Sequence, residues 1–288
     1  MFDVYSWFFY EYMKYIFIFI LLILHQFIHY CAGLNLHKKI KNKHKHMKTV
    51  FHSADSRGFA DHGWLKSAHS FSFAGYFNPE RVNFGTLRVL NDDYVEGGMG
   101  FGKHPHNNME IISIPLEGDL KHGDNMGSAG IIKKGDVQVM SAGTGVMHSE
   151  MNANADKAVK FLQIWIFPNK ENVTPRYDQV DVSGDYKKND FQQILSPNAD
   201  DAGVWIHQDA WFNVANFDKG FNKDYPIHKE GNGAYVFVLN GQVKIGDQVL
   251  NTRDALGIWD IDKFNIEATE NSEVLIIDVP MNLPNFAN

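Results

Sequence analysis

The sequence predicts an all-β fold made of two β-barrels. From Met47 onward, the apolar segments are short, rich in β-branched and aromatic residues, and bounded by Gly, Asn, Asp and Pro, which is typical of strands. These segments show no pattern of a long amphipathic helix. A weak internal repeat, in which residues 233–260 can be laid over residues 109–141, predicts that a second barrel is built like the first.

The first 46 residues form a hydrophobic and basic extension. Residues 15–36 contain no Lys, Arg, Asp or Glu and are long enough for one membrane span, although two histidines and a glutamine within them weaken that interpretation. The lysines that follow would keep the C-terminal side in the cytoplasm if this segment were an anchor. The alternatives are a disordered tail or upstream sequence translated by an over-long gene model.

The first half of the remaining chain holds four predicted strand segments: residues 84–95, 109–116, 136–143 and 159–168. Residues 119–136, which precede the third, are rich in Gly, Asp and Asn, as hairpin connections require. We therefore expect a strand-dominated domain over residues 47–175.

Two short clusters in this domain point to a metal site: HPH at residues 104–106 and HSE at residues 148–150. Each places two candidate ligands at i and i+2, so on β-strands each pair would leave its strand on one face. A lone His-x-His is more often structural in a chain with 14 histidines. The glycines around both clusters nevertheless indicate strand, turns and strand, with ligands at corresponding positions. We predict a metal site formed by His104, His106, His148 and Glu150.

Three neutral imidazoles and one carboxylate make a donor set of intermediate softness. This set suits Fe, Mn, Co, Ni, Cu or Zn and is poor for Ca or Mg. For a metal that prefers six ligands, four protein ligands leave two positions, which O2 and a chelating substrate oxygen can occupy together. The donor set therefore indicates metal chemistry rather than a structural ion alone.

These clusters resemble the two sequence motifs of the cupin superfamily, and the wording HPH, GTGVMHSE, FLQIWIFP and TPRYDQ is similar to the pirin family. The resemblance runs from about Met47 to the C-terminus, which favours Met47 as the natural start. It implies a bicupin, with a metal-binding cupin domain over residues 47–175 and a C-terminal cupin domain over residues 176–288. The pattern departs from the general cupin motifs in two places, since seven residues separate Glu110 from the next glycine and Ser141 replaces a common Pro.

The resemblance implies a mononuclear Fe(II) site and the oxidative ring cleavage of quercetin or a related flavonol by O2. On this interpretation Glu150 is a ligand and also the general base that takes a hydroxyl proton from the substrate. Glu110, at cupin spacing after the HPH cluster, is the alternative carboxylate ligand. The alternative function is a non-enzymatic, iron-binding, redox-sensitive regulator that acts through protein–protein contacts, because a cupin fold hosts both functions. The family resemblance makes a monomer the default.

The second half of the chain is expected to lack a metal site. The repeat places Ile266 and Ala268 at the positions of His148 and Glu150, and neither can bind a metal. Between the halves, residues 169–203 are polar and are interpreted as a linker with a short helical turn.

Several other histidines are expected to lie outside the metal site. His52, His62 and His69 are predicted to pack and to form hydrogen bonds, and a place near the cavity is the alternative for His69. His122 falls in a stretch rich in Gly, Asp and Asn and is predicted to lie in a surface loop.

The cysteine count and the net charge bear on the compartment of the protein and on its binding partners. The single cysteine, Cys31, excludes an intramolecular disulfide and suits a reducing compartment, so we expect a cytoplasmic protein or one anchored with its barrels on the cytoplasmic side. Removing the six lysines and two acidic residues of the first 46 positions from the totals of 27 and 34 leaves 21 basic and 32 acidic residues. Such an acidic body argues against direct binding to nucleic acid phosphates.

Overall fold

The computed structural model describes residues 23–27 and 47–287. Residues 23–27 are helical and exposed, and they belong to a unit of residues 1–46 that is separate from the compact unit of residues 47–288. Apart from this turn, the candidate span at residues 15–36 lies outside the described residues. Among the residues that are described, no helix has both the length and the apolar character needed to cross a membrane.

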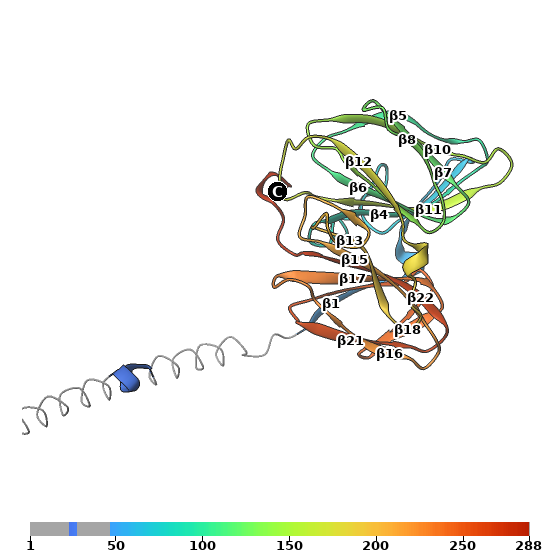
Figure 1. Ribbon diagram of the computed structural model, residues 1–288. Helices are drawn as coiled ribbons and strands as arrows, with labels where there is room; N and C mark the ends of the chain where they lie inside the picture. The colour runs from blue at the N-terminus through green and yellow to red at the C-terminus, as the bar shows by residue number, and fades with distance from the viewer. Residues whose placement is uncertain (1–22, 28–46, 288) are drawn as a thin grey trace, which may run out of the picture. The chain divides into compact units, whose positions relative to one another are not determined.

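The first barrel is built from two antiparallel sheets (Figure 1). Its seven-stranded sheet has the order β12-β9-β6-β11-β4-β3-β2 and consists of β2 (Gly58–Asp61), β3 (Leu65–His69), β4 (Leu87–Val95), β6 (Glu110–Glu117), β9 (Asp136–Ser141), β11 (Val159–Ile166) and β12 (Arg176–Asp181). Its four-stranded sheet has the order β5-β10-β7-β8 and consists of β5 (Gly100–His106), β7 (Leu120–Asp124), β8 (Ala129–Ile132) and β10 (Val146–Asn152). Each of the four strand segments predicted in this half overlaps one of these strands: β4, β6, β9 and β11.

The second barrel repeats this plan. Its seven-stranded sheet has the order β1-β20-β17-β22-β15-β13-β14 and consists of β1 (Lys48–His52), β13 (Phe191–Ser196), β14 (Val204–Trp205), β15 (Trp211–Phe217), β17 (Asn232–Asn240), β20 (Ala255–Trp259) and β22 (Ser272–Pro280). Its four-stranded sheet has the order β16-β21-β18-β19 and consists of β16 (Asn222–Pro226), β18 (Gln242–Ile245), β19 (Gln248–Asn251) and β21 (Lys263–Ala268). Short 3₁₀ helices occur at η1 (Ala54–Ser56), η2 (Ser183–Asp185) and η3 (Asn285–Ala287). The prediction of an all-β fold with two barrels and few short helices is confirmed.

Each barrel includes one strand from the part of the chain that otherwise forms the other barrel. Strand β1 pairs with β20 and lies among the strands of the second barrel, as Figure 1 shows by its blue colour, whereas β12 pairs with β9 in the first. The interpretation of residues 169–203 as a linker is therefore wrong, because they contain β12 and β13. The sequence RYDQVD of β12 lacks an apolar pattern because this strand lies at the edge of its sheet, with half-buried side chains.

The hydrophobic cores explain why one barrel is hollow. A large cluster joins the two seven-stranded sheets, with Leu90 and Ile164 from the first barrel and Phe212 and Leu275 from the second. A second cluster fills the interior of the second barrel. The first barrel has only two small clusters inside it. Burial of each large apolar side chain stabilises the fold by roughly 1.5–3 kcal/mol. The interior of the first barrel buries fewer such side chains than that of the second, which leaves room for a cavity at a cost in stability.

Candidate metal centre

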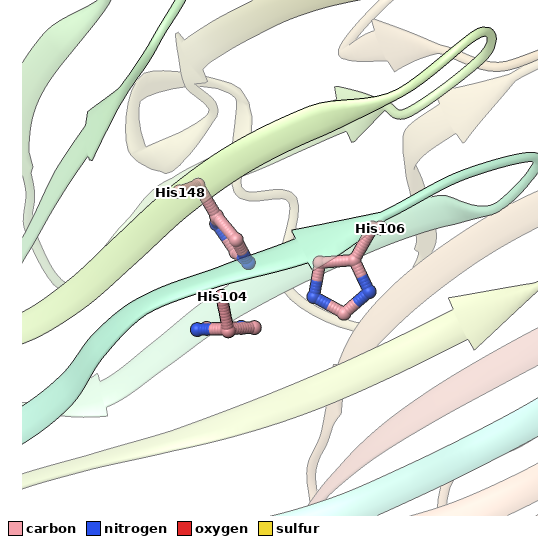
Figure 2. Close-up of side chains that lie close together, drawn as sticks. All are labelled: His104, His106 and His148. Carbon is pink, nitrogen blue, oxygen red and sulfur yellow. The ribbon is translucent and has the colours of Figure 1, made fainter.

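The imidazoles of His104, His106 and His148 converge at one place inside the first barrel. Strands β5 and β10 are adjacent and antiparallel, and His104 lies directly opposite His148 in their register. Ring centroids are 4.4 Å apart for His104 and His148 and 4.9 Å apart for each of the other two pairs. Figure 2 shows the three side chains pointing toward one another from the two strands. One nitrogen of each lies within 4.8 Å of the others, which is close enough to share a metal ion.

The protonation of these histidines fits a metal. The Nδ1 atom of His104 donates to the Gly102 carbonyl oxygen at 2.8 Å, which leaves Nε2 with a free lone pair. Both ring nitrogens of His148 are buried and have no hydrogen-bond partner in the part of the chain that the structure describes. Burial, with a smaller effect of the neighbouring histidines, lowers the pKa of His106 to about 4 and that of His148 to about 3. The lowered pKa values keep the rings of His106 and His148 neutral near pH 7, as nitrogen ligands require. A transition-metal ion would satisfy one of the two buried nitrogens of His148.

Glu150 lies two residues after His148 on β10, but it is not a member of the three-histidine group. The register between β10 and β5 shifts by one residue between these two positions. Its Oε1 atom accepts a hydrogen bond from Ser113 Oγ at 2.8 Å, and its Oε2 atom accepts one from Gln163 Nε2 at 2.6 Å. Burial raises the pKa of Glu150, and the bond from Ser113 opposes that rise. The role of Glu150 as fourth ligand stays a prediction.

A cavity of about 580 Å³ adjoins this centre, and His104 and Glu150 form part of its wall. Its volume is within the range of pockets that hold small organic ligands. Much of its lining is aromatic, from Phe59, Phe73, Tyr76, Phe101 and Trp165. The cavity can therefore enclose an aromatic compound beside the metal position and shield it from water.

Five polar residues occupy matching register positions on five adjacent strands of the large sheet, and we call them the polar row. They are His69 on β3, Asn91 on β4, Gln163 on β11, Ser113 on β6 and Gln138 on β9. Their exposed fractions run from 0 to 7%. Two of them hold the Glu150 carboxylate, which crosses from the facing four-stranded sheet. The row is not visible in the sequence, because it depends on the pairing of strands that are distant in the chain.

The second barrel is apolar at the equivalent positions. The bond from Ala268 N to Phe221 O corresponds to the bond from Asn152 N to Met99 O, which places Phe264 and Ile266 where the first barrel has His148 and Glu150. The repeat predicted Ile266 and Ala268, and that register is wrong by two residues because the turn before β21 is shorter. Among the described residues, His104, His106 and His148 are the group placed to bind a metal. That the second barrel lacks metal ligands stays a prediction.

His122 was predicted to lie in a surface loop, and this is wrong. It lies on β7, is 1% exposed, and its Nε2 atom is 3.0 Å from Asp124 Oδ2. Its ring stacks on Tyr177 at 4.5 Å and lies 5.5 Å from the ring of His148. The alternation of Leu120 and His122 along a strand was the signal for burial, but the surrounding turn residues obscured it.

The remaining predicted residues are placed as follows. Glu110, the alternative ligand, is buried, accepts a hydrogen bond from Ser141 Oγ at 2.6 Å and does not belong to the histidine group. Burial raises the pKa of Glu110 to about 7. His52 pairs with Tyr235 Oη at 2.8 Å, which confirms a packing and hydrogen-bonding role. His62 and His69 line the cavity, which is the alternative position given for His69, and the His69 ring also packs against Phe73.

Comparisons with known proteins agree with this architecture. Residues 50–166 match the family model described as Pirin, and residues 193–279 match the model described as Quercetinase C-terminal cupin domain. A protein of Escherichia coli strain K12 named quercetin 2,3-dioxygenase is 41% identical over 227 residues, which cover 79% of this chain and 96% of that protein. A pirin-like protein of Caulobacter vibrioides is 38% identical, with coverage of 78% and 96% respectively.

A solved structure shares both sequence and fold with this chain. The bacterial pirin YhhW of Escherichia coli, crystallised in complex with nickel(II), is 39% identical and superposes with a TM-score of 0.76. The match covers 81% of this chain and 99% of that protein.

Proposed function

The chain belongs to the pirin family, and on that premise we propose that it is a metal-dependent dioxygenase that uses O2 to cleave the ring of quercetin or a related flavonol. The observation that carries the proposal is the convergence of three imidazoles beside an aromatic-lined cavity, whose wall includes His104. The relatives named quercetin 2,3-dioxygenase supply the reaction type, and the site supplies ligands and room for an aromatic substrate.

We assign the metal to His104, His106 and His148, with Glu150 as the fourth ligand and Fe(II) as the working ion. Co, Mn, Ni, Cu and Zn suit the same donors, since all are borderline ions that accept imidazole nitrogen. When bound, the ion would supply two open positions, one for O2 and one for a substrate oxygen.

The protein's own contribution centres on the proton of the substrate hydroxyl. Glu150 is the proposed general base, and its oxygens take the proton as the flavonol binds. Burial raises the pKa of this carboxyl in the metal-free protein. The donors Ser113 and Gln163 hold its two oxygens in place, so the base is oriented before the substrate arrives.

Oxygen uptake tests this function. We expect the full chain, loaded anaerobically with Fe(II), to consume O2 when quercetin is added, and His148→Ala to lose both metal and uptake. Glu150→Gln should retain much of the iron and lose turnover by about 10²- to 10⁴-fold, the usual contribution of a general base. The matched control is Glu117→Gln on the same barrel, an exposed carboxylate paired with Lys160, which should behave as the unaltered protein.

Full activity of Glu150→Gln would refute its role as base. Absence of oxygen uptake with every member of a flavonol panel, in protein that retains iron, would refute the dioxygenase. That result would favour the alternative, an iron-binding regulator that acts through protein contacts.

A further inference from the structure

The cavity wall contains three buried polar atoms without partners among the described residues: Trp165 Nε1 and two atoms at one end of the polar row. His69 Nδ1 and Asn91 Oδ1 are both inaccessible to solvent and have no hydrogen-bond partner within the described residues. The two residues lie directly opposite each other on β3 and β4, are 3% and 2% exposed, and both line the cavity. An unmade hydrogen bond at a buried atom is costly, so such atoms indicate a ligand group that pairs with them.

These atoms lie away from the metal position along the sheet. Glu150 contacts the row at Gln163 on β11, Asn91 is on the next strand, and His69 is on the strand after that. Because neighbouring strands are about 4.8 Å apart, His69 lies roughly 10 Å along the row from Gln163. A substrate with one oxygen at the metal position would therefore extend along the row toward His69 and Asn91.

The surroundings of the pair suit an aromatic ring that carries a neutral polar group. The rings of Phe73 and Tyr76 lie 5.3 and 6.3 Å from that of His69. The neighbouring polar pair, Ser67 and Asp93, is already joined by a hydrogen bond from the serine hydroxyl. Burial lowers the pKa of His69, so its imidazole is neutral and offers one donor and one acceptor.

We propose that His69 and Asn91 bind a phenolic hydroxyl on the pendant phenyl ring of the flavonol and thereby determine which flavonols the protein prefers. The hydroxyl donates its hydrogen to Asn91 Oδ1 and accepts a hydrogen from His69 Nδ1, so one group satisfies both orphaned atoms. This inference rests on the proposed function, because it takes a flavonol as the occupant of the cavity.

The test compares two flavonols that differ by one hydroxyl. Kaempferol carries a hydroxyl on its pendant phenyl ring, and galangin is the same compound without it. Dissociation constants are measured anaerobically by fluorescence quenching on the full chain loaded with Ni(II). We expect the unaltered protein to bind kaempferol about ten-fold more tightly than galangin, which corresponds to one buried hydrogen bond.

Asn91→Leu and His69→Phe should each bring the ratio of the two dissociation constants close to one. If thermal unfolding shows that Asn91→Leu has lost its fold, Asn91→Ser takes its place. The matched control is Thr86→Val, which removes another buried and unpartnered polar atom that does not line the cavity. It should keep the full preference.

The outcomes distinguish a failure of this inference from a failure of the proposed dioxygenase function. Equal affinity of the unaltered protein for both flavonols, or an unchanged preference in the Asn91 and His69 variants, overturns the inference even if oxygen uptake is normal. Loss of the preference in those variants supports it even if no oxygen is consumed. Failure of the unaltered protein to bind either flavonol overturns both.

Discussion

The buried carboxyl of Asp93 should make the stability of this protein depend on pH. Asp93 is 2% exposed on β4 and accepts a hydrogen bond from Ser67. Burial raises its pKa from the ordinary 3.8 to about 7, and the nearby Glu150 adds to the rise. In the unfolded chain the group regains its ordinary pKa, so between about pH 4 and 7 the folded state keeps a proton that the unfolded state releases. Stability should therefore fall as the pH rises through this window and level off above it.

The magnitude follows from the width of the window. A rise from 3.8 to about 7 spans about three pH units, and each unit corresponds to 1.36 kcal/mol, so the loss approaches about 4 kcal/mol. Asp93→Asn removes the titrating group and keeps an oxygen for the Ser67 hydroxyl. The variant should match the unaltered protein near pH 4 and be more stable by up to about 4 kcal/mol at pH 8. The raised pKa of Glu110 acts in both proteins and cancels in the difference.

Urea unfolding at a series of pH values from 4 to 8, on metal-free protein, measures this difference directly. The surface variant Asp156→Asn serves as the control for loss of one negative charge. The reasoning fails if the free-energy difference between Asp93→Asn and the unaltered protein stays constant with pH, or if the variant is the less stable of the two at pH 8.

Two further changes test the support of the site and the fold around it. Gln163→Leu removes the donor to Glu150 Oε2, and we expect metal affinity to fall by roughly 10- to 100-fold in chelator competition. Gln138→Leu, in the same polar row but without a contact to Glu150, should leave the affinity near its original value, and an equal fall in both would contradict the assignment. Gly203→Ala should destabilise the protein by about 2 kcal/mol or more in urea unfolding, because φ is +86° and the added Cβ would lie 2.1 Å from the Ile194 carbonyl oxygen. A stable alanine variant would show that the loop can relax.

The fold class and the core of the candidate site were predictable because their signals are local. Strand segments can be recognised from the composition of a few residues. The i, i+2 spacing of His104 and His106 places both side chains on one face of any strand. Conversely, His122 was misjudged because its strand is short and is surrounded by turn residues. Burial there depends on Tyr177, which the linear pattern of the neighbouring residues does not reveal.

The sequence by itself determined which residues can bind a metal, which half of the chain holds them, and that both halves form β-barrels. Only the tertiary structure decided that β1 joins the second barrel and that β12 joins the first. It also decided that Gln163 and Ser113 meet Glu150. The same holds for His69 and Asn91, which face one cavity. The physical reason is that strand pairing is a long-range choice. Register between distant segments is set by the sum of packing on both faces of a sheet, which no single stretch of sequence specifies.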